Sequence, residues 1–339
     1  MAHVRGRKVG ANSTEMTGSL HPISNYLRTL AWAIFLPVSV FAITVIINFP
    51  YASDKPLGQD QVDQARKYYA DAYQKPATSE NVSTYETEYK RLGERAAETF
   101  QIEKQVRSFV TAYNLKNASV LEIGSGRGSL QNIVENYTGL DISPTVAKYY
   151  QKPFVLGSAT SLPFEDNSFD AIWSVWVFEH VLNPEQAFAE ARRVTRQGGL
   201  LFLFPAWNVS SWLAEGYSVR PYSDFDPIGK IIKASISFRS SLAFKAATIL
   251  PVRVARATFA ASGPTKLRYR RLTPNYEQYW TVDSDAVNSI DTYEAILWFT
   301  SRGDECLNCG DQPIIFPVVH TPLIIRVNKA TENAALPAK

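Results

Sequence analysis

The sequence predicts a doubly wound α/β fold with a mostly parallel sheet of seven strands, and three observations support this class. Short apolar segments alternate with helical patterns throughout residues 86–205. A glycine-rich turn directly follows the first of these segments. A basic and aromatic stretch interrupts the alternation after the fifth segment, as an insertion would. Strands that alternate with helices run parallel, because each crossover helix returns the chain to the same edge of the sheet.

The composition is that of a globular protein with a slight apolar excess. Of 339 residues, 45% are hydrophobic and 20% are charged, and the formal net charge is +3. The two cysteines, Cys306 and Cys309, are too few for a disulfide framework. Two thiols alone also cannot complete a tetrahedral zinc site, although His320 is near in sequence. We expect the cysteines in a free or paired surface loop, with metal or redox chemistry as the alternative.

The N-terminal part predicts a membrane anchor. Residues 1–29 are polar and basic, and we expect a disordered tail there. Residues 30–49 carry no charge, and twenty residues is the length that crosses a bilayer core as a helix. A buried core helix or a cleaved signal peptide is the alternative, although the stretch is long for a signal peptide. Residues 50–85 are predicted to be a polar linker with a short helix over 61–73.

The glycine-rich turn is the feature around which the core is predicted to form. Residues 118–123 have a strand pattern, three alternate glycines follow, and a helix is expected within 129–136. Alternate glycines let the backbone approach a ligand closely. Asp141 ends the next strand pattern, thirteen residues past Gly128, where a carboxylate can accept hydrogen bonds from ribose hydroxyls. A dinucleotide fingerprint would need glycine in place of Ser129, so the turn alone leaves methyltransferase and nucleotide-binding oxidoreductase open.

The remaining elements follow from periodicity. A helical period covers residues 86–113, before the glycine turn. After Asp141 the predicted strands are 154–156, 171–175, 200–204, 293–300 and 322–327, and the predicted helices are 144–150, 184–196 and 282–290. The last two strands would be the sixth and seventh of the sheet.

Several ordered motifs carry a resemblance to a known family. The run E-x-G-x-G-x-G at 122–128, with L-P-F at 162–164, F-E-H-V at 178–181 and G-G at 198–199, resembles the class I S-adenosylmethionine-dependent methyltransferases of the small-molecule subgroup. The resemblance implies a Rossmann-like sheet with an antiparallel seventh strand, and S-adenosyl-L-methionine as cofactor. The cofactor-binding residues that it implies are Glu122, Gly124, Gly126, Gly128, Asp141, Ile142, Ser158, Ala159 and Val175.

The resemblance also implies the chemistry, which is direct displacement of a methyl group by a positioned nucleophile. His180 and Glu179 are the candidate catalytic residues, as a base for a protonated acceptor. Structural roles in the loop after the fourth strand are the alternative for both. Ser158 stands where the family usually has an acid, so looser adenine binding is expected. Trp176 replaces the first acid of the E-x-x-E-H pattern of metal-dependent relatives, so no metal is predicted.

Residues 206–280 are predicted to form an inserted lid. Aromatic walls with a few polar groups suit a small organic acceptor, and the candidate lid residues are Trp207, Trp212, Tyr217, Arg220 and Tyr222. A packed lid without ligand contact is the alternative. Residues 227–275 carry ten basic residues and no acid, which is typical of a solvated face but, beside an anchor, favours docking on anionic lipid. No recognised nucleic-acid module accompanies this patch, so nucleic acid is not a predicted partner.

The predicted function is methyl transfer to a small or lipid-linked acceptor at the membrane surface. The alternative is a non-catalytic binding protein of the same fold that docks on membranes or on a partner enzyme. Arg5, Arg7 and Lys8 favour a cytoplasmic N-terminus and hence an external main domain. Because the cofactor is cytosolic, we nevertheless expect a single-pass anchor with a cytosolic catalytic domain. Residues 281–330 would complete the core and 331–339 would form a tail, whereas the acceptor and the oligomeric state are not predicted.

Overall fold

The computed structural model describes residues 21–56, 58–72, 93–214, 216–259, 263–275, 283–317 and 321–329. The chain divides into two units, residues 1–47 and residues 48–339. Most of the first unit's described part is one long helix, α1 (His21–Asn48). Its stretch Arg28–Asn48 has a mean hydropathy of 2.5, is not buried, and is long and apolar enough to cross a membrane. Because α1 begins at His21, part of the predicted tail is helical, and residues 1–20 lie outside the described residues.

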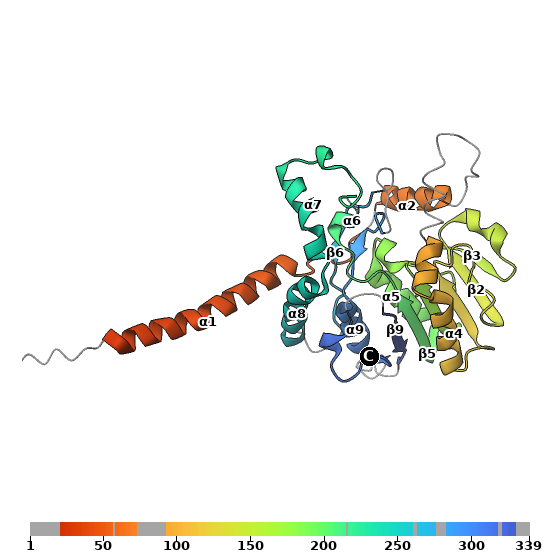
Figure 1. Cartoon of the computed structure of the whole chain (residues 1–339). Coiled ribbons are helices and arrows are strands. Elements are labelled where there is room, and N and C mark those ends of the chain that lie inside the picture. Colours follow the sequence, from red (N-terminus) through yellow and green to blue (C-terminus); the bar gives the residue numbers. More distant parts are fainter. Residues whose placement is uncertain are drawn as a thin grey trace, which may run out of the picture. The chain divides into compact units, whose positions relative to one another are not determined.

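The second unit is built on a seven-stranded sheet of order β3-β2-β1-β4-β5-β9-β8 (Figure 1). The strands are β1 (Ser119–Ile123), β2 (Asn136–Asp141), β3 (Phe154–Leu156), β4 (Phe169–Val175), β5 (Thr195–Phe204), β8 (Glu305–Cys306) and β9 (Leu323–Arg326). The first five pair in parallel. Strand β9 is antiparallel to both β5 and β8. This confirms the predicted Rossmann-like sheet of the class I methyltransferase fold.

The strand order reverses beside β1, since β2 and β3 lie on one side of it and β4 and β5 on the other. In open parallel sheets, ligands bind in the crevice at the carboxyl ends of the strands where this reversal occurs. Gly124 follows β1 and Trp176 follows β4, so both loops lie at this crevice.

Helices cover both faces of the sheet, and alternation along the strands decides which side chain meets which helix. On one face, α4 (Ile102–Ala112) packs its buried residues into a cluster with Val120 of β1 and Trp173 of β4. On the other face, α5 (Pro184–Val194) and α9 (Thr292–Thr300) share a cluster with Leu121 and Ile172. Neighbouring residues of one strand thus belong to opposite halves of the core.

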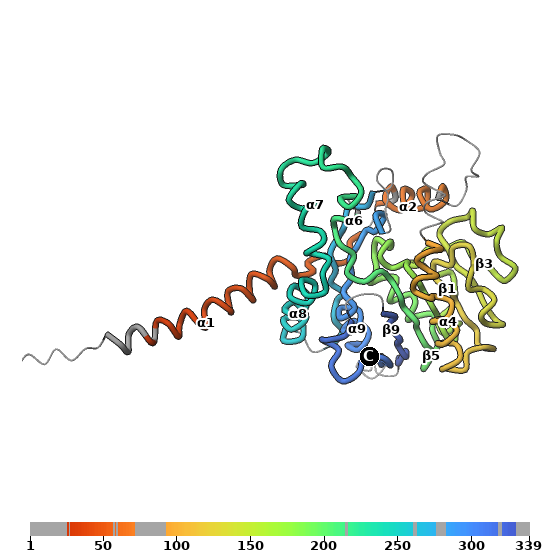
Figure 2. The backbone as a smooth tube through the Cα atoms, in the orientation of Figure 1, coloured from red at the N-terminus to blue at the C-terminus, as the bar shows by residue number. Residues whose placement is uncertain are grey.

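Other described elements of the second unit connect or flank these layers (Figure 2). They are α2 (Gln59–Ala72), α6 (Ser211–Ala214), α7 (Pro227–Arg239), α8 (Leu242–Thr258), a two-stranded sheet of β6 (Arg270–Arg271) and β7 (Asn288–Ser289), and four 3-10 helices. The 3-10 helices are η1 (Pro144–Tyr149), η2 (Phe178–His180), η3 (Tyr222–Asp224) and η4 (Pro313–Ile315). Helix η1 occupies the predicted helix 144–150 in a tighter form.

Two predicted elements near the C-terminus are wrong. Residues 293–300 belong to helix α9 instead of a strand, and Asp291 caps this helix by accepting a hydrogen bond from the backbone N–H of Tyr293. Seven of its nine residues are buried, so α9 carries the uninterrupted apolar and aromatic run that is also typical of a buried strand. In place of the predicted helix 282–290, residues 283–285 form a turn that leads to β7, and residue 282 lies outside the described residues.

The helix expected within 129–136 is also wrong, because those residues form turns that lead into β2. The side-chain oxygen of Gln131 accepts a hydrogen bond from the backbone N–H of Gln151 at 2.9 Å. The backbone N–H of Glu135 donates to the carbonyl of Lys116 at 2.8 Å. Bonds to distant segments thus replace the i to i−4 bonds that a helix would need.

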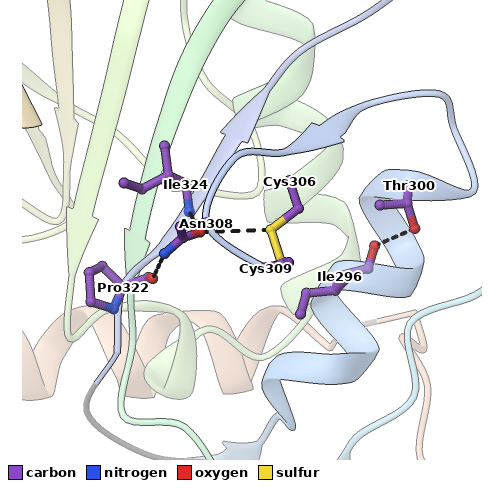
Figure 3. Close-up of a disulfide and its surroundings, with 7 residues drawn as sticks. All are labelled: Ile296, Thr300, Cys306, Asn308, Cys309, Pro322 and Ile324. Carbon is purple, nitrogen blue, oxygen red and sulfur yellow. Dashed lines mark hydrogen bonds between the residues drawn. A yellow bond between two sulfur atoms is a disulfide. The ribbon is translucent and has the colours of Figure 1, made fainter. Parts of the chain in front are cut away.

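The two cysteines form a disulfide, with Cα atoms 5.6 Å apart, in the turn between β8 and β9 (Figure 3). Between them in sequence, Asn308 donates to the carbonyl of Pro322 at 2.8 Å and accepts from the backbone N–H of Ile324 at 2.9 Å. The paired alternative of the sequence prediction therefore describes this loop. The disulfide and Asn308 together fix the turn against β9.

Candidate cofactor and catalytic site

A pocket lies at the carboxyl ends of β1, β2, β3 and β4, where the strand order reverses. The predicted cofactor-binding residues that line it are Gly124, Asp141, Ile142, Ser158 and Ala159. The loop after β4 adds Trp176, Val177 and His180. The remaining cofactor candidates, Glu122, Gly126, Gly128 and Val175, do not line this pocket.

Gly124 needs to be glycine for two separate reasons. Its φ is +71°, a left-handed conformation that only glycine adopts without strain. A Cβ atom added to it would lie 2.1 Å from Cγ2 of Val177, well inside van der Waals contact. The backbone N–H groups of Gly124 and Ser125 both donate to the carbonyl of Leu140, at 2.8 and 3.0 Å. The turn after β1 is therefore pressed against β2 and the loop after β4.

Asp141 is held in one orientation at the end of β2. One carboxylate oxygen accepts from the backbone N–H of Gly126 at 2.8 Å, and the other accepts from that of Ser143 at 2.9 Å. The side chain is 7% exposed, and burial raises its pKa above the ordinary value, against the lowering effect of these bonds. Each oxygen keeps further acceptor capacity, so a buried carboxylate faces the pocket and can accept hydroxyl hydrogen bonds.

Glu122 does not line the pocket, and its predicted role in binding the cofactor stays a prediction. It is buried in β1 and accepts a hydrogen bond of 2.5 Å from the Tyr137 hydroxyl of β2. Burial raises the pKa of Glu122 to about 8, although the Tyr137 bond lowers it. The carboxyl group therefore carries a proton over much of the neutral range, inside the sheet and behind the pocket.

The two candidate catalytic residues come from η2 and lie together. His180 lines the pocket, and its Nε2 is 3.8 Å from Oε1 of the buried Glu179. Its Nδ1 is 3.6 Å from Oδ2 of Asp285. Burial lowers the pKa of His180, but the carboxylates of Asp285 and Glu179 outweigh it and raise the pKa overall. Burial raises the pKa of Glu179.

Helix α2 supplies a wall of the pocket that the sequence prediction assigned to a linker. Val62, Ala65 and Tyr69 line the pocket from three positions on one face of this otherwise polar helix. The Tyr69 hydroxyl donates to Asp285 at 3.1 Å, and its ring stands edge-on to His180 at 6.0 Å. The spacing i, i+3, i+7 of these residues within a polar stretch was the signal available in the sequence.

The five candidate lid residues do not line this pocket. Trp207 is buried and donates to the carbonyl of Thr321 at 2.8 Å. Tyr217 stacks on Phe225 at 4.6 Å between ring centroids, and Arg220 lies over the same ring. The remaining two lie close to cations of α7, Trp212 to Arg239 at 4.4 Å and Tyr222 to Lys233 at 5.2 Å. A role in binding the acceptor stays a prediction.

The structure describes contacts for several cations of the basic stretch 227–275. Most of these cations are held by other groups of the protein. The guanidinium of Arg253 on α8 is 1% exposed and pairs with Asp291, and Arg256 pairs with Glu294. Arg270 donates to the carbonyl of Asn48 at 2.7 Å. These arginines therefore fix the second unit internally, and only part of the positive charge is left to face a membrane.

Comparisons with known proteins match part of this chain to methyltransferases. Residues 121–203 match the family described as a methyltransferase domain. An uncharacterized protein of Methanocaldococcus jannaschii is 33% identical over 129 residues, which is 37% of this chain and 46% of that protein. A malonyl-[acyl-carrier protein] O-methyltransferase of Coxiella burnetii is 30% identical over 125 residues, covering 33% and 44%. A phthiotriol/phenolphthiotriol dimycocerosates methyltransferase of Mycobacterium leprae is 32% identical over 118 residues, covering 30% and 44%.

The chain therefore spans less than half the length of these relatives. The matched domain and the sheet topology are those of class I S-adenosylmethionine-dependent methyltransferases, and they imply S-adenosyl-L-methionine as methyl donor. The pocket suits that group in two respects. Gly124 lines the pocket at the end of β1, where the strand order reverses, and the fixed carboxylate of Asp141 can accept hydrogen bonds from hydroxyl groups.

Proposed function

We propose that this protein transfers the methyl group of S-adenosyl-L-methionine to a small or lipid-linked acceptor at a membrane surface. The observation that carries the proposal is the pocket at the reversal of strand order, with Gly124 and Asp141 in its wall. When bound, the cofactor supplies a methyl group on a positively charged sulfur. Asp141 would accept hydrogen bonds from the ribose hydroxyls, and Ile142 and Ala159 would offer apolar contact to the adenine.

The acceptor would be activated by the pair from η2. His180 lines the pocket, and Glu179 and Asp285 stand on its two nitrogen sides. An imidazole with carboxylates at both nitrogens can take a proton from the acceptor and keep the resulting charge paired. Helix α2 covers the pocket with Val62, Ala65 and Tyr69, and so limits access of water to the reacting atoms.

Cofactor binding is the first test. Calorimetric titration of the full-length chain in detergent micelles should show one S-adenosyl-L-methionine site. Asp141→Ala should weaken it about 10-fold to 100-fold, because hydrogen bonds to a charged group are worth about 1.5–3 kcal/mol. Asp166→Ala, at an exposed carboxylate, should leave the affinity unchanged. Absence of binding, or equal binding by the two variants, would refute the proposed site.

Catalysis is tested separately from binding. The alternative function is that of a non-catalytic binding protein with the same fold. Incubation of the purified chain with methyl-labelled cofactor and a membrane extract should transfer label to an extractable acceptor. Binding of the cofactor without any transfer, in extracts where other methyltransferases act, would favour the alternative.

The membrane part of the proposal rests on α1 and on the insert. Apolar side chains on α7 and at the start of α8 are exposed to solvent: Ile228 (67%), Ile231 (69%), Phe238 (67%) and Leu242 (71%). Lys230 lies among them in sequence and Lys245 follows them, and residues 227–275 contain no acid. Exposed apolar groups interspersed with cations suit the headgroup layer of an anionic bilayer.

An environment-sensitive fluorophore on Leu242→Cys tests this docking, with Leu156→Cys on β3 as a matched exposed control. In the full chain reconstituted into vesicles, the label at 242 should shift to the blue when phosphatidylserine replaces neutral lipid. The label at 156 should not respond. Equal responses at the two positions, or none at 242, would rule out docking through α7 and α8.

A further inference from the structure

The residues Glu179, His180 and Asp283 form a cluster that the proposed methyl transfer does not fully use. One carboxylate or imidazole atom from each lies within 4.8 Å of the atoms from the other two. Glu179 and His180 belong to η2, whereas Asp283 comes 103 residues later, from the turn before β7. His180 also lines the cofactor pocket, so the cluster adjoins the proposed site of reaction.

Two atoms of this cluster are buried without a hydrogen-bond partner in the described part of the chain. They are Oε2 of Glu179 and Nδ1 of His180. Glu179 is 1% exposed, and its other oxygen already accepts from the backbone N–H of Ala206 at 3.1 Å. A buried carboxylate oxygen without a partner is costly, and proteins normally satisfy it with a hydrogen bond or a cation.

The charges around the imidazole also do not balance. Glu179, Asp283 and Asp285 are three carboxylates beside one histidine, and Asp285 accepts a hydrogen bond from the neutral Tyr69 hydroxyl. The nitrogen–oxygen distances of 3.8 and 3.6 Å are too long for hydrogen bonds. A protonated His180 would contribute one positive charge against three negative charges. A divalent cation bound beside the neutral imidazole would offset two of the three negative charges.

We infer that Glu179, His180 and Asp283 bind a divalent metal ion. The mixed nitrogen and oxygen set suits Mn²⁺, Fe²⁺ or Zn²⁺ better than Ca²⁺, which prefers oxygen ligands alone. The E-x-x-E-H pattern of metal-dependent relatives is incomplete here, because Trp176 replaces its first acid. The fold instead brings Asp283 to the cluster from a distant segment. If the proposed methyl transfer holds, a metal here would take the place of His180 in activating the acceptor, because a metal-bound imidazole cannot take a proton, and it would favour acceptors that present a hydroxyl or carboxylate oxygen. Metal binding itself does not depend on that function.

Manganese binding to the metal-free, full-length chain in detergent micelles tests the inference without cofactor or acceptor. Loss of the electron paramagnetic resonance signal of free Mn²⁺ should reveal one bound ion per chain. Asp283→Asn should weaken binding by at least about tenfold, the lower end of what loss of even an outer partner of a metal site costs. Asp311→Asn, at an exposed acid, should bind like the unaltered chain.

Glu179→Gln is the second variant, and should weaken binding similarly if Asp283→Asn fails to fold, as judged by circular dichroism. The inference is overturned if the unaltered chain binds no ion, or if both cluster variants bind as tightly as Asp311→Asn. Because neither cofactor nor transfer enters the measurement, loss of cofactor binding would refute the proposed function and leave the metal result standing. Loss of metal binding together with intact cofactor binding would refute only the metal site.

Discussion

Replacement of Gly124 by alanine tests how tightly the glycine turn is pressed against the loop after β4. An alanine at φ +71° costs about 1–2 kcal/mol, because the left-handed conformation brings its Cβ close to the backbone. The new Cβ would also lie 2.1 Å from Cγ2 of Val177, and forcing such a contact apart costs about 1–3 kcal/mol more. The expected loss of unfolding free energy is therefore about 2–5 kcal/mol, as the sum of the two effects.

Gly198 offers the matched control for the backbone part alone. Its φ is +77°, yet a Cβ added there meets nothing within 4 Å. Gly198→Ala should therefore cost only about 1–2 kcal/mol. In a Val177→Ala background, which removes the two closest carbon atoms, the cost of Gly124→Ala should fall toward the same value.

Urea unfolding of the full chain in detergent micelles measures these differences, through the fluorescence of buried tryptophans such as Trp173. The four chains of the Gly124 and Val177 cycle should give a coupling free energy of about 1–3 kcal/mol. The packing explanation would be refuted if Gly124→Ala cost the same in both backgrounds, or no more than Gly198→Ala.

Two further predictions concern buried charged groups. The pKa of Glu122 is raised from 4.5 to about 8, so the native state keeps a proton that the unfolded chain loses. The unfolding free energy should therefore fall as pH rises from about 4.5 to 8, by up to about 1.4 kcal/mol per pH unit, and Glu122→Gln should flatten this slope in urea unfolding at pH 5 and pH 8. Arg253→Met should lower the unfolding free energy by about 3–5 kcal/mol, because it leaves the Asp291 carboxylate without its cation. Adding Asp291→Asn should recover part of the loss in the same assay, and no recovery would contradict the ion-pair explanation.

The parallel part of the sheet was predictable because its signals are local. Strands β1, β4 and β5 contain apolar runs bounded by turn residues, and each buries side chains on both faces. The glycine turn and Asp141 were predictable for the same reason, since each lies immediately after a strand. Sequence order then places both at the same edge of a parallel sheet, and the pocket lies there.

Elements fixed by distant contacts could not be predicted in this way. Helix α9 is enclosed by the core, so its sequence lacks the polar stripe that distinguishes a surface helix from a buried strand. The segment 129–136 is held in turns by partners such as Gln151 and Lys116. The approach of Asp283 and Asp285 to His180 depends on the packing of the whole segment between β5 and β7, which no local pattern specifies.

Helix α2 has a consequence for how the isolated enzyme should be handled. It begins eleven residues after α1 ends, so a segment close in sequence to the apolar helix is also a wall of the pocket. A shortened chain that starts near residue 80, which would be the natural choice for removing the apolar helix, would lack Val62, Ala65 and Tyr69. The pocket of such a fragment would open to water beside His180. A lack of activity in an assay would then be due to the missing wall of the pocket. Removing the apolar helix while keeping the site intact therefore calls for a cut between the end of α1 and Ala52, whose backbone pairs with Tyr269.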